Sequence, residues 1–196
     1  MGLDLLPERI RTKYEVHEWR HATSILKTDF PEQWNDLISL LDNFELRKSS
    51  IITRGGGKSP ISGYMDSFLY NLNWIEKKFD TSKIIDGVRL ETPTHKIDCV
   101  KGRIALDIEW NNKDPFYDRD LNNFRLLFDL GAISIGIIIT RSDELQIIFN
   151  ELEKGKSYGS STTHMSKLLP RINGGGGSGC PILVFGITSN CYNEAT

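Results

Sequence analysis

The sequence lacks several features that would have assigned it quickly to a class. It has only three cysteines in 196 residues and no CxxC pair, so neither a disulfide framework nor a zinc knuckle is indicated. It also lacks any run of roughly 18 apolar residues, which excludes a membrane-spanning helix. Charged residues from Asp4 onward are unlike a secretion signal. We therefore expect an intracellular, cytoplasmic protein whose thiols are reduced and partly buried.

An excess of positive charge is missing as well. The 24 Lys and Arg residues are slightly outnumbered by 26 Asp and Glu residues, giving a formal net charge of −2. A nonspecific nucleic-acid coat would be strongly basic, so a nucleic-acid reader of this composition would need its cations concentrated locally. The 39% hydrophobic content is ordinary for a folded protein and excludes a disordered chain. We expect a single domain over residues 1–196.

Helical patterns dominate the first half of the chain. Apolar residues recur at helical spacing from Pro7 to about Lys27, and Pro31 is placed to open a second helix. After a glycine-containing break at 53–60, a third amphipathic segment runs through Trp74. Two further helices are predicted in the second half, over residues 119–130 and 143–155.

Strand patterns are confined to the second half. Segments 83–91 and 94–100 alternate like a pair of strands, and three β-branched runs follow at 102–110, 132–140 and 181–188. The run from Ile133 to Ile139 is almost wholly apolar, which is typical of a central strand covered on both faces. The alternation of strands and helices predicts an α/β fold with a central mixed sheet flanked by helices.

Three carboxylates stand out in the strand region. Asp98 ends one predicted strand, a turn at Lys101-Gly102 reverses the chain, and Asp107 and Glu109 lie on the same face of the next strand. Clustered carboxylates in an apolar strand repel one another unless a cation neutralises them, and hard oxygen ligands favour Mg²⁺ or Mn²⁺. The spacing alone also fits a simpler alternative, a solvated strand face paired with nearby lysine and arginine side chains.

The wider sequence resembles a known family. Asp98, followed nine residues later by Asp107-x-Glu109, resembles the PD-(D/E)xK nuclease core, specifically the BglII, BstYI and BamHI branch of type II restriction endonucleases. Further segments that resemble this branch are FPEQWNDLISLL (30–41), AISIGIIITRSDEL (132–145), and SYGSSTTHMSKLL with GGGGSGCPILVFGIT within 157–188. The resemblance covers roughly residues 30–188 and implies a restriction-endonuclease-like fold.

The resemblance implies specific roles for the carboxylates. Asp98 and Asp107 would bind the metal, the Ile108 carbonyl could add a ligand, and Glu109 falls where the wider superfamily has lysine. Glu109 would bind the metal, position the attacking water or accept its proton. A fourth polar group of this branch comes from a helix near an Asn-Trp pair. The only carboxylate in the segment 73–78 is Glu76, one residue out of register because Lys77 occupies the matching place; a solvated helix end is the alternative.

Two loops are candidate readers of DNA. The first follows the strand that carries Glu109 and leads into a helix, so recognition and catalysis would be physically coupled; its candidate contacts are Asn111, Asn112, Lys113 and Arg119. The second is a hydroxyl-rich segment whose candidate contacts are Ser157, Ser160, Ser161, Thr162, Thr163 and His164, with Ser160 and Thr162 preferred. Arg54 and Lys58 could clamp the DNA backbone from the glycine-rich segment, although a plain loop is an equal alternative.

Together these features predict a type II restriction endonuclease of a prokaryotic cytoplasm. It would hydrolyse both strands of double-stranded DNA at a short palindromic site, using Mg²⁺ or Mn²⁺, as a homodimer, beside a methyltransferase that protects the same site. The cut DNA would have 5′-phosphate and 3′-hydroxyl ends. Two alternatives stay open: a DNA-binding or dimeric module whose catalysis has decayed, and a repair or nicking nuclease on the same fold.

Overall fold

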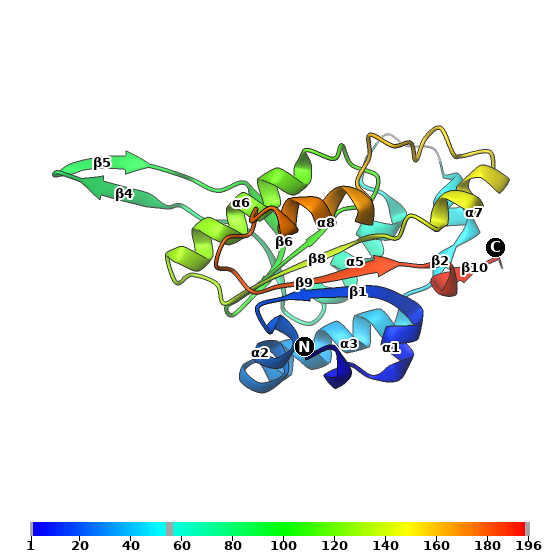
Figure 1. Ribbon diagram of the computed structural model, residues 1–196, viewed down its shortest axis with the longest axis horizontal. Helices are drawn as coiled ribbons and strands as arrows, with labels where there is room; N and C mark the ends of the chain where they lie inside the picture. Colours follow the sequence, from blue (N-terminus) through cyan, green and yellow to red (C-terminus); the bar gives the residue numbers. More distant parts are fainter. Residues whose placement is uncertain (1, 54–56, 195–196) are drawn as a thin grey trace.

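A mixed six-stranded sheet organises the computed structural model, which describes residues 2–53 and 57–194 (Figure 1). The strand order is β1-β9-β8-β7-β6-β3, with parallel pairing across the central strands β7, β8 and β9 and antiparallel pairing elsewhere in the sheet. The six strands are β1 Tyr14–Trp19, β3 Ile75–Lys78, β6 Lys96–Lys101, β7 Ile104–Ile108, β8 Ile135–Arg141 and β9 Ile182–Ile187. The predicted central mixed sheet is confirmed.

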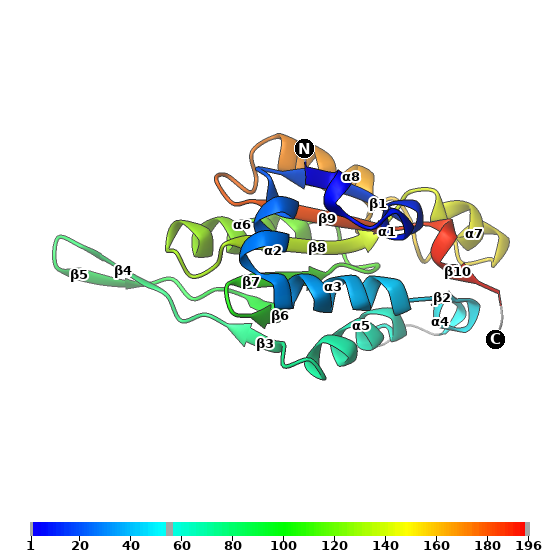
Figure 2. The ribbon, with the colours of Figure 1, turned by 90° about the horizontal axis from the view of Figure 1, so that it is seen from below.

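Helices cover both faces of the sheet (Figures 1 and 2). On one side lie α6 Phe116–Asp129 and α8 Met165–Asn173. The other described helices are α1 Glu8–Lys13, α2 Ala22–Asp29, α3 Pro31–Asn43, α4 Lys48–Ile52, α5 Pro60–Tyr70 and α7 Leu145–Glu151, with short 3-10 turns at Gly2–Leu5 and Ser189–Cys191. Two short strands, β2 Leu46–Arg47 and β10 Tyr192–Asn193, pair with each other away from the main sheet.

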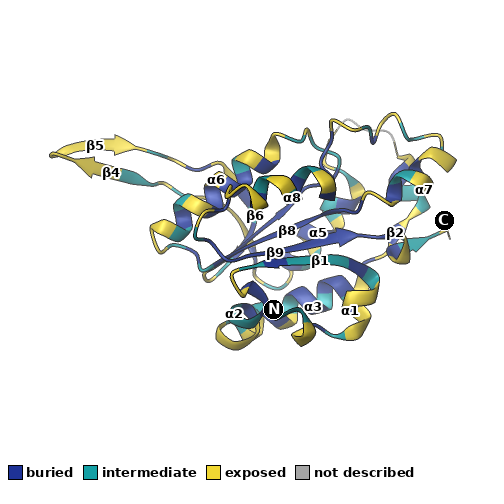
Figure 3. Cartoon of the chain, viewed as in Figure 1, coloured by how far each residue is buried: buried dark blue, intermediate teal, exposed yellow. Residues whose placement is uncertain are grey.

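Strand β8 occupies the middle of the sheet. All its residues from Ile135 to Arg141 are buried, as Figure 3 shows, because helices cover it on both faces. Gly136 is needed here because a Cβ would meet the Phe124 ring of α6 at 2.3 Å. The apolar run therefore forms the two-sided central strand that its sequence predicted.

The predicted first helix, from Pro7 to about Lys27, is wrong in its middle, because a strand separates two short helices. Helix α1 ends at Lys13, and Tyr14–Trp19 is instead the edge strand β1, paired with β9. Tyr14 and Glu18 are buried while the residues between them are half-buried. The aromatic and aliphatic residues of this segment thus serve a sheet edge, which periodicity over so short a stretch does not distinguish from a helix.

The predicted pairing of 83–91 with 94–100 is also wrong. Residues 82–91 form a hairpin of their own, with β4 Ser82–Ile85 paired to β5 Val88–Glu91, while β6 pairs with β3 and β7. Gly87 at φ +80° permits the tight reversal. The hairpin projects from the body of the molecule, as Figures 1 and 3 show. Its side chains Ile84 and Val88 are exposed.

The three cysteines are free and buried, as expected. Within the described ranges, no helix is both long and apolar enough to cross a membrane.

Candidate active site

The site is built on the antiparallel strands β6 and β7. Gly102, at φ +58°, turns the chain between them, and each strand offers a carboxylate to the backbone of the other. The Asp98 backbone N–H donates to Asp107 Oδ1 at 3.0 Å, and the Ile108 backbone N–H donates to Asp98 Oδ2 at 2.9 Å. These reciprocal bonds fix Asp98 and Asp107 beside each other, as the sequence predicted. They do not fit the alternative of a freely solvated strand face.

Asp107 and Glu109 are buried almost completely, each 1% exposed. Burial is the main reason that the pKa of Asp107 is raised well above its usual value, and Asp120 and Asp98 add to the effect. Burial likewise raises the pKa of Asp98 to about 6 and that of Glu109 to about 9. Asp107 Oδ2 is a buried oxygen with no hydrogen-bond partner. Desolvated, unpaired carboxylates of this kind are characteristic of functional sites.

Asp120 is a fourth carboxylate of this cluster, and the sequence interpretation missed it. It lies on α6, is fully buried, and its Oδ2 has no hydrogen-bond partner. Its position did carry a signal, because it stands among the buried residues Tyr117, Leu121 and Phe124 of the apolar helix face. An acid at a core-facing helix position is costly unless it has a specific partner.

Both oxygens of Glu109 are held by predicted DNA-contacting residues, one in the first reading loop and one on the helix α6 that follows it. Asn112 Nδ2 donates to Glu109 Oε2 at 2.8 Å, and Arg119 Nη2 lies 3.2 Å from Glu109 Oε1. Arg119 also pairs with Asp120 Oδ1 at 2.8 Å. The structure therefore joins two predicted DNA-contacting side chains directly to a predicted catalytic carboxylate.

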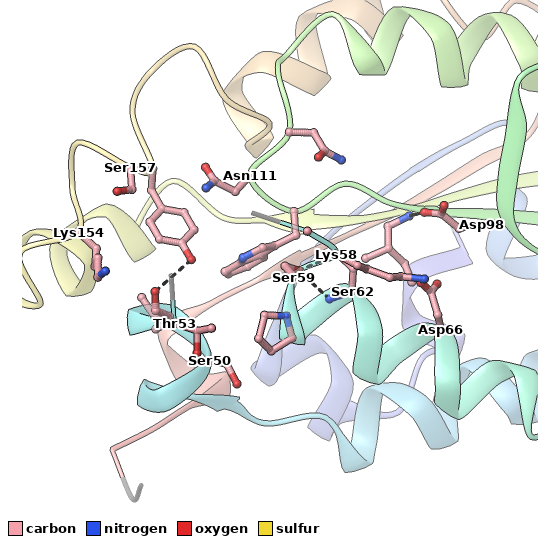
Figure 4. Close-up of a pocket in the computed structure, with 17 residues that line it drawn as sticks. Ser50, Thr53, Lys58, Ser59, Ser62, Asp66, Asp98, Asn111, Lys154 and Ser157 are labelled. Carbon is pink, nitrogen blue, oxygen red and sulfur yellow. Dashed lines mark hydrogen bonds and ion pairs between the residues drawn. The ribbon is translucent and has the colours of Figure 1, made fainter. Parts of the chain in front are cut away.

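A cleft of about 640 Å³ opens beside these strands (Figure 4). Asp98, Ile108 and Trp110 contribute to its lining from the sheet side. One wall comes from α4, α5 and the segment before α5, and the other comes from the two predicted reading loops; the lining residues include Ser50, Thr53, Lys58, Ser59, Asp66, Asn111, Asn112, Lys154 and Ser157. The cleft thus brings Asp98 together with Lys58, Asn111, Asn112 and Ser157.

Asp66 is a further carboxylate that the sequence interpretation missed. It lies on α5 with 1% of its surface exposed, forms an ion pair with Lys58, and accepts a hydrogen bond from Cys99 Sγ at 3.5 Å. Its signal in the sequence was an acid beside the buried helix residues Met65 and Leu69. Asp66, like Asp98, borders the cleft.

Glu76 does not lie at the end of a helix, which corrects the expected placement. Helix α5 ends at Tyr70, and Glu76 belongs to the exposed strand β3. Its carboxylate pairs with Lys96 Nζ at 2.6 Å. Helix α5 ends four residues before Trp74, so the Asn-Trp pair and Glu76 lie beyond it. The carboxylate that α5 does bring to the cleft is Asp66.

The second reading loop divides into exposed and buried residues. Ser157, Ser160, Ser161 and the facing Lys113 are exposed. Thr163 is completely buried and its Oγ1 accepts from the Asn112 backbone, so the predicted direct contact of Thr163 with DNA is not available in this conformation. The hydroxyl of Thr162 donates to Gly159 O at 2.8 Å, which leaves it no donor for a base. These two residues support the loop.

His164 precedes α8 and its Nδ1 lies 2.7 Å from Asp143 Oδ1. It is the N-cap residue of the helix and is 7% exposed, so little of its side chain is available for the predicted contact with DNA. Arg54 lies outside the described residues.

The fold and the paired carboxylates of β6 and β7 define a nuclease of the PD-(D/E)xK class. A family model described as restriction endonuclease BglII/BglIII matches residues 14–187, and the chain belongs to this family. It is therefore a restriction endonuclease, a phosphodiester hydrolase that cleaves DNA in restriction and modification. No curated protein matches the sequence.

Proposed function

We propose that this endonuclease hydrolyses both strands of double-stranded DNA at a short palindromic site and leaves 5′-phosphate and 3′-hydroxyl ends. The observation that carries the proposal is the reciprocal bonding of Asp98 and Asp107 beside the loop that holds Glu109. A palindromic site is matched by a two-fold homodimer in which each copy cuts one strand. The enzyme would act in a prokaryotic cytoplasm beside a methyltransferase that protects the same site.

The donor set fits Mg²⁺, with Mn²⁺ as a substitute. Among the described residues, no three Asp, Glu, His or Cys side chains are grouped so that they could hold a metal ion. Mg²⁺, however, is usually held by only one or two carboxylates together with water and substrate phosphate. The unpaired, buried Asp107 Oδ2 is a suitable hard ligand. Asp98, Asp107 and the Ile108 carbonyl would hold the ion, with Glu109 beside them.

When bound, such an ion would stabilise charge on the scissile phosphate and favour ionisation of a water molecule. Glu109 would orient that water or accept its proton. Burial raises the pKa of Glu109 to about 9, which favours a protonated carboxyl group in the metal-free protein. It must lose this proton before it can act as a base.

Recognition would be coupled to cleavage through Glu109. The side chains of Asn112, in the first loop, and Arg119, on the helix α6 that follows it, contact this carboxylate now, and both are expected to contact DNA. Amide and guanidinium groups suit adenine and guanine edges or phosphates. If these side chains turn towards DNA, the contacts that hold Glu109 change in the same movement. Lys58, Lys113, Ser157, Ser160 and Ser161 are exposed and would complete the DNA contacts.

Digestion of unmethylated phage DNA tests the proposal. Purified protein would be incubated with Mg²⁺ or Ca²⁺ and the product ends sequenced, with Asp107→Asn as the matched inactive control. Discrete fragments with 5′-phosphate ends in Mg²⁺ alone are expected. Binding without cutting would indicate a module whose catalysis has decayed, and nicks or random ends would indicate a repair or nicking nuclease; either result would contradict the proposal.

A further inference from the structure

The two reading loops lie about fifty residues apart in the sequence but form one hydrogen-bonded unit. The Thr163 backbone N–H donates to Asn112 O at 2.8 Å, and the Asn112 backbone N–H donates to Thr163 Oγ1 at 3.1 Å. The Asp114 N–H donates to Ser161 O at 3.1 Å, and Lys113 and Thr162 form an isolated antiparallel bridge. The loops therefore cannot move independently without breaking these bonds.

Arg141 lies beneath this unit, at the end of the central strand β8, with only 1% of its surface exposed. Its Nε donates to Thr163 O at 3.1 Å, and its Nη2 donates to Tyr158 O and to Thr162 Oγ1, both at 3.0 Å. A single planar guanidinium group thus ties three positions of the second loop to the fully buried strand β8.

Aromatic rings enclose the same guanidinium group. Its central carbon lies 5.3 Å from the centroid of the Phe149 ring and 5.9 Å from that of Tyr158. The Phe149 and Tyr158 rings stack on each other, with centroids 4.0 Å apart, and both pack edge-on against Trp110, next to the first loop. The packing connects Arg141 to both loops.

A buried cation that is satisfied mainly by carbonyl and hydroxyl oxygens is expensive compared with an apolar side chain of similar size. Its planar guanidinium group nevertheless presents its donors in a rigid fork, whereas lysine is a point charge on a flexible stem. We therefore relate the free-energy cost of burying Arg141 to a need for exact placement of the loops. Reading base edges requires such placement, because a hydrogen bond is lost when its atoms are displaced by about an ångström.

We propose that Arg141 is a positioning residue for sequence discrimination, which holds the loops 111–115 and 157–164 at a fixed spacing so that they read the DNA site as one surface. The proposal rests on the proposed function. Arg141 does not touch DNA itself, because it is buried beneath Thr162 and Thr163. It acts through the exposed side chains that the two loops carry.

The first test requires no DNA. Hydrogen exchange would be followed by mass spectrometry in peptides covering both loops, in the wild type, Thr162→Val and Thr162→Ser. Valine removes the hydroxyl that accepts from Arg141, whereas serine keeps it. We expect Thr162→Val to raise exchange about tenfold in 111–116 as well as in 157–164, and Thr162→Ser to raise neither. Faster exchange in 157–164 alone would overturn the linkage.

The second test measures discrimination. Once the cleavage site has been sequenced, kcat/KM would be compared on that site and on duplexes with one base pair replaced. Arg141→Lys keeps the charge but loses the fork, and we expect the preference for the correct site to fall about tenfold. Arg103→Lys is the matched control. Arg103 is exposed just before β7, beside the start of β8 and away from Arg141, and its Nε donates to Ser134 Oγ. The preference of this variant should be unchanged.

An equal loss on all duplexes would show that Arg141 supports the fold generally and would overturn the proposal. If the wild type cuts no DNA, the proposed function fails, while the exchange measurement still decides whether Arg141 links the loops. If Arg141→Lys does not fold, Thr162→Val replaces it in the discrimination test. The same fall in preference for the correct site is expected.

Discussion

Strands β7 and β8 lie side by side in parallel register, yet β7 carries a buried carboxylate, Asp107, opposite the apolar stretch of β8. Asp107 is the partner of Ile138 across the pair, and both are buried. The apolar side chains of β8 gain free energy when they leave water, whereas a carboxylate that is buried without a partner loses it. The unpaired Asp107 Oδ2 and the raised pKa values of Asp107 and Glu109 are the marks of that loss. We infer that Asp107 gives up stability for chemistry, whereas the apolar residues of β8 opposite it supply stability.

Removal of Glu109 should have the largest effect on the β7 side of this comparison. Glu109→Ala deletes the group expected to orient water or accept its proton, so cleavage should fall about a thousandfold. The protein should remain folded, because Arg119 keeps its ion pair with Asp120. Single-turnover cleavage together with circular dichroism checks both statements. Undiminished cleavage by a folded Glu109→Ala protein would refute the assignment.

Truncation of a β8 side chain should have the reverse effect. Ile137 is fully buried between Leu106 and Leu183, so Ile137→Ala should lower the free energy of unfolding by about 3 kcal/mol through lost burial and a residual cavity. Cleavage per folded molecule should stay within about twofold. Urea unfolding and active-site titration measure the two quantities, and a large loss of cleavage with unchanged stability would reverse the comparison.

The pH dependence of stability should show the cost of the buried carboxylates. The folded pKa of Asp98, about 6, lies above its ordinary value of 3.8, so the folded protein binds more protons between these values. The contribution of Asp98 to stability is therefore complete below about pH 4 and is lost as the pH rises through 6. Relative to Asp98→Asn, metal-free wild type should lose about 2 kcal/mol over this range. Urea unfolding of both proteins tests this, and a rise would contradict it.

The smallest expected difference is the one between the effects on cleavage of replacing two carboxylates near β6. Asp66 is buried at the cleft, so Asp66→Asn should reduce cleavage about tenfold, a change of about 1.4 kcal/mol in the barrier. Glu76 forms an exposed pair with Lys96, and such pairs contribute about 1 kcal/mol or less, so Glu76→Gln should change cleavage by less than about twofold. Equal losses of cleavage in parallel assays would contradict the prediction that the buried carboxylate matters more than the exposed one.

Sequence patterns predicted the four inner strands of the sheet and the Asp98–Asp107 pair, because β-branched runs and a glycine turn are local signals. The hydrogen bonds that join Asn112 to Thr163 could not be predicted, because they depend on how distant segments pack. Asp66 and Asp120 have a recognisable signal in the sequence, because each is an acid on an apolar helix face. They were missed because the spacing of carboxylates along strands says nothing about acids on helices. Edge strand β1 was missed because its pattern is short and its burial uneven.

Asp107→Asn tests the central claim most directly, provided that stability and cleavage are measured on the same preparation. Asparagine keeps an oxygen for the Asp98 N–H, removes a buried charge, and can offer a donor where Oδ2 now has no partner. We predict that urea unfolding shows a free energy equal to the wild-type value or about 1 kcal/mol higher, while Mg²⁺-dependent cleavage falls at least about a thousandfold. A variant that is less stable than the wild type, or one that still cuts within about tenfold of it, would contradict the account.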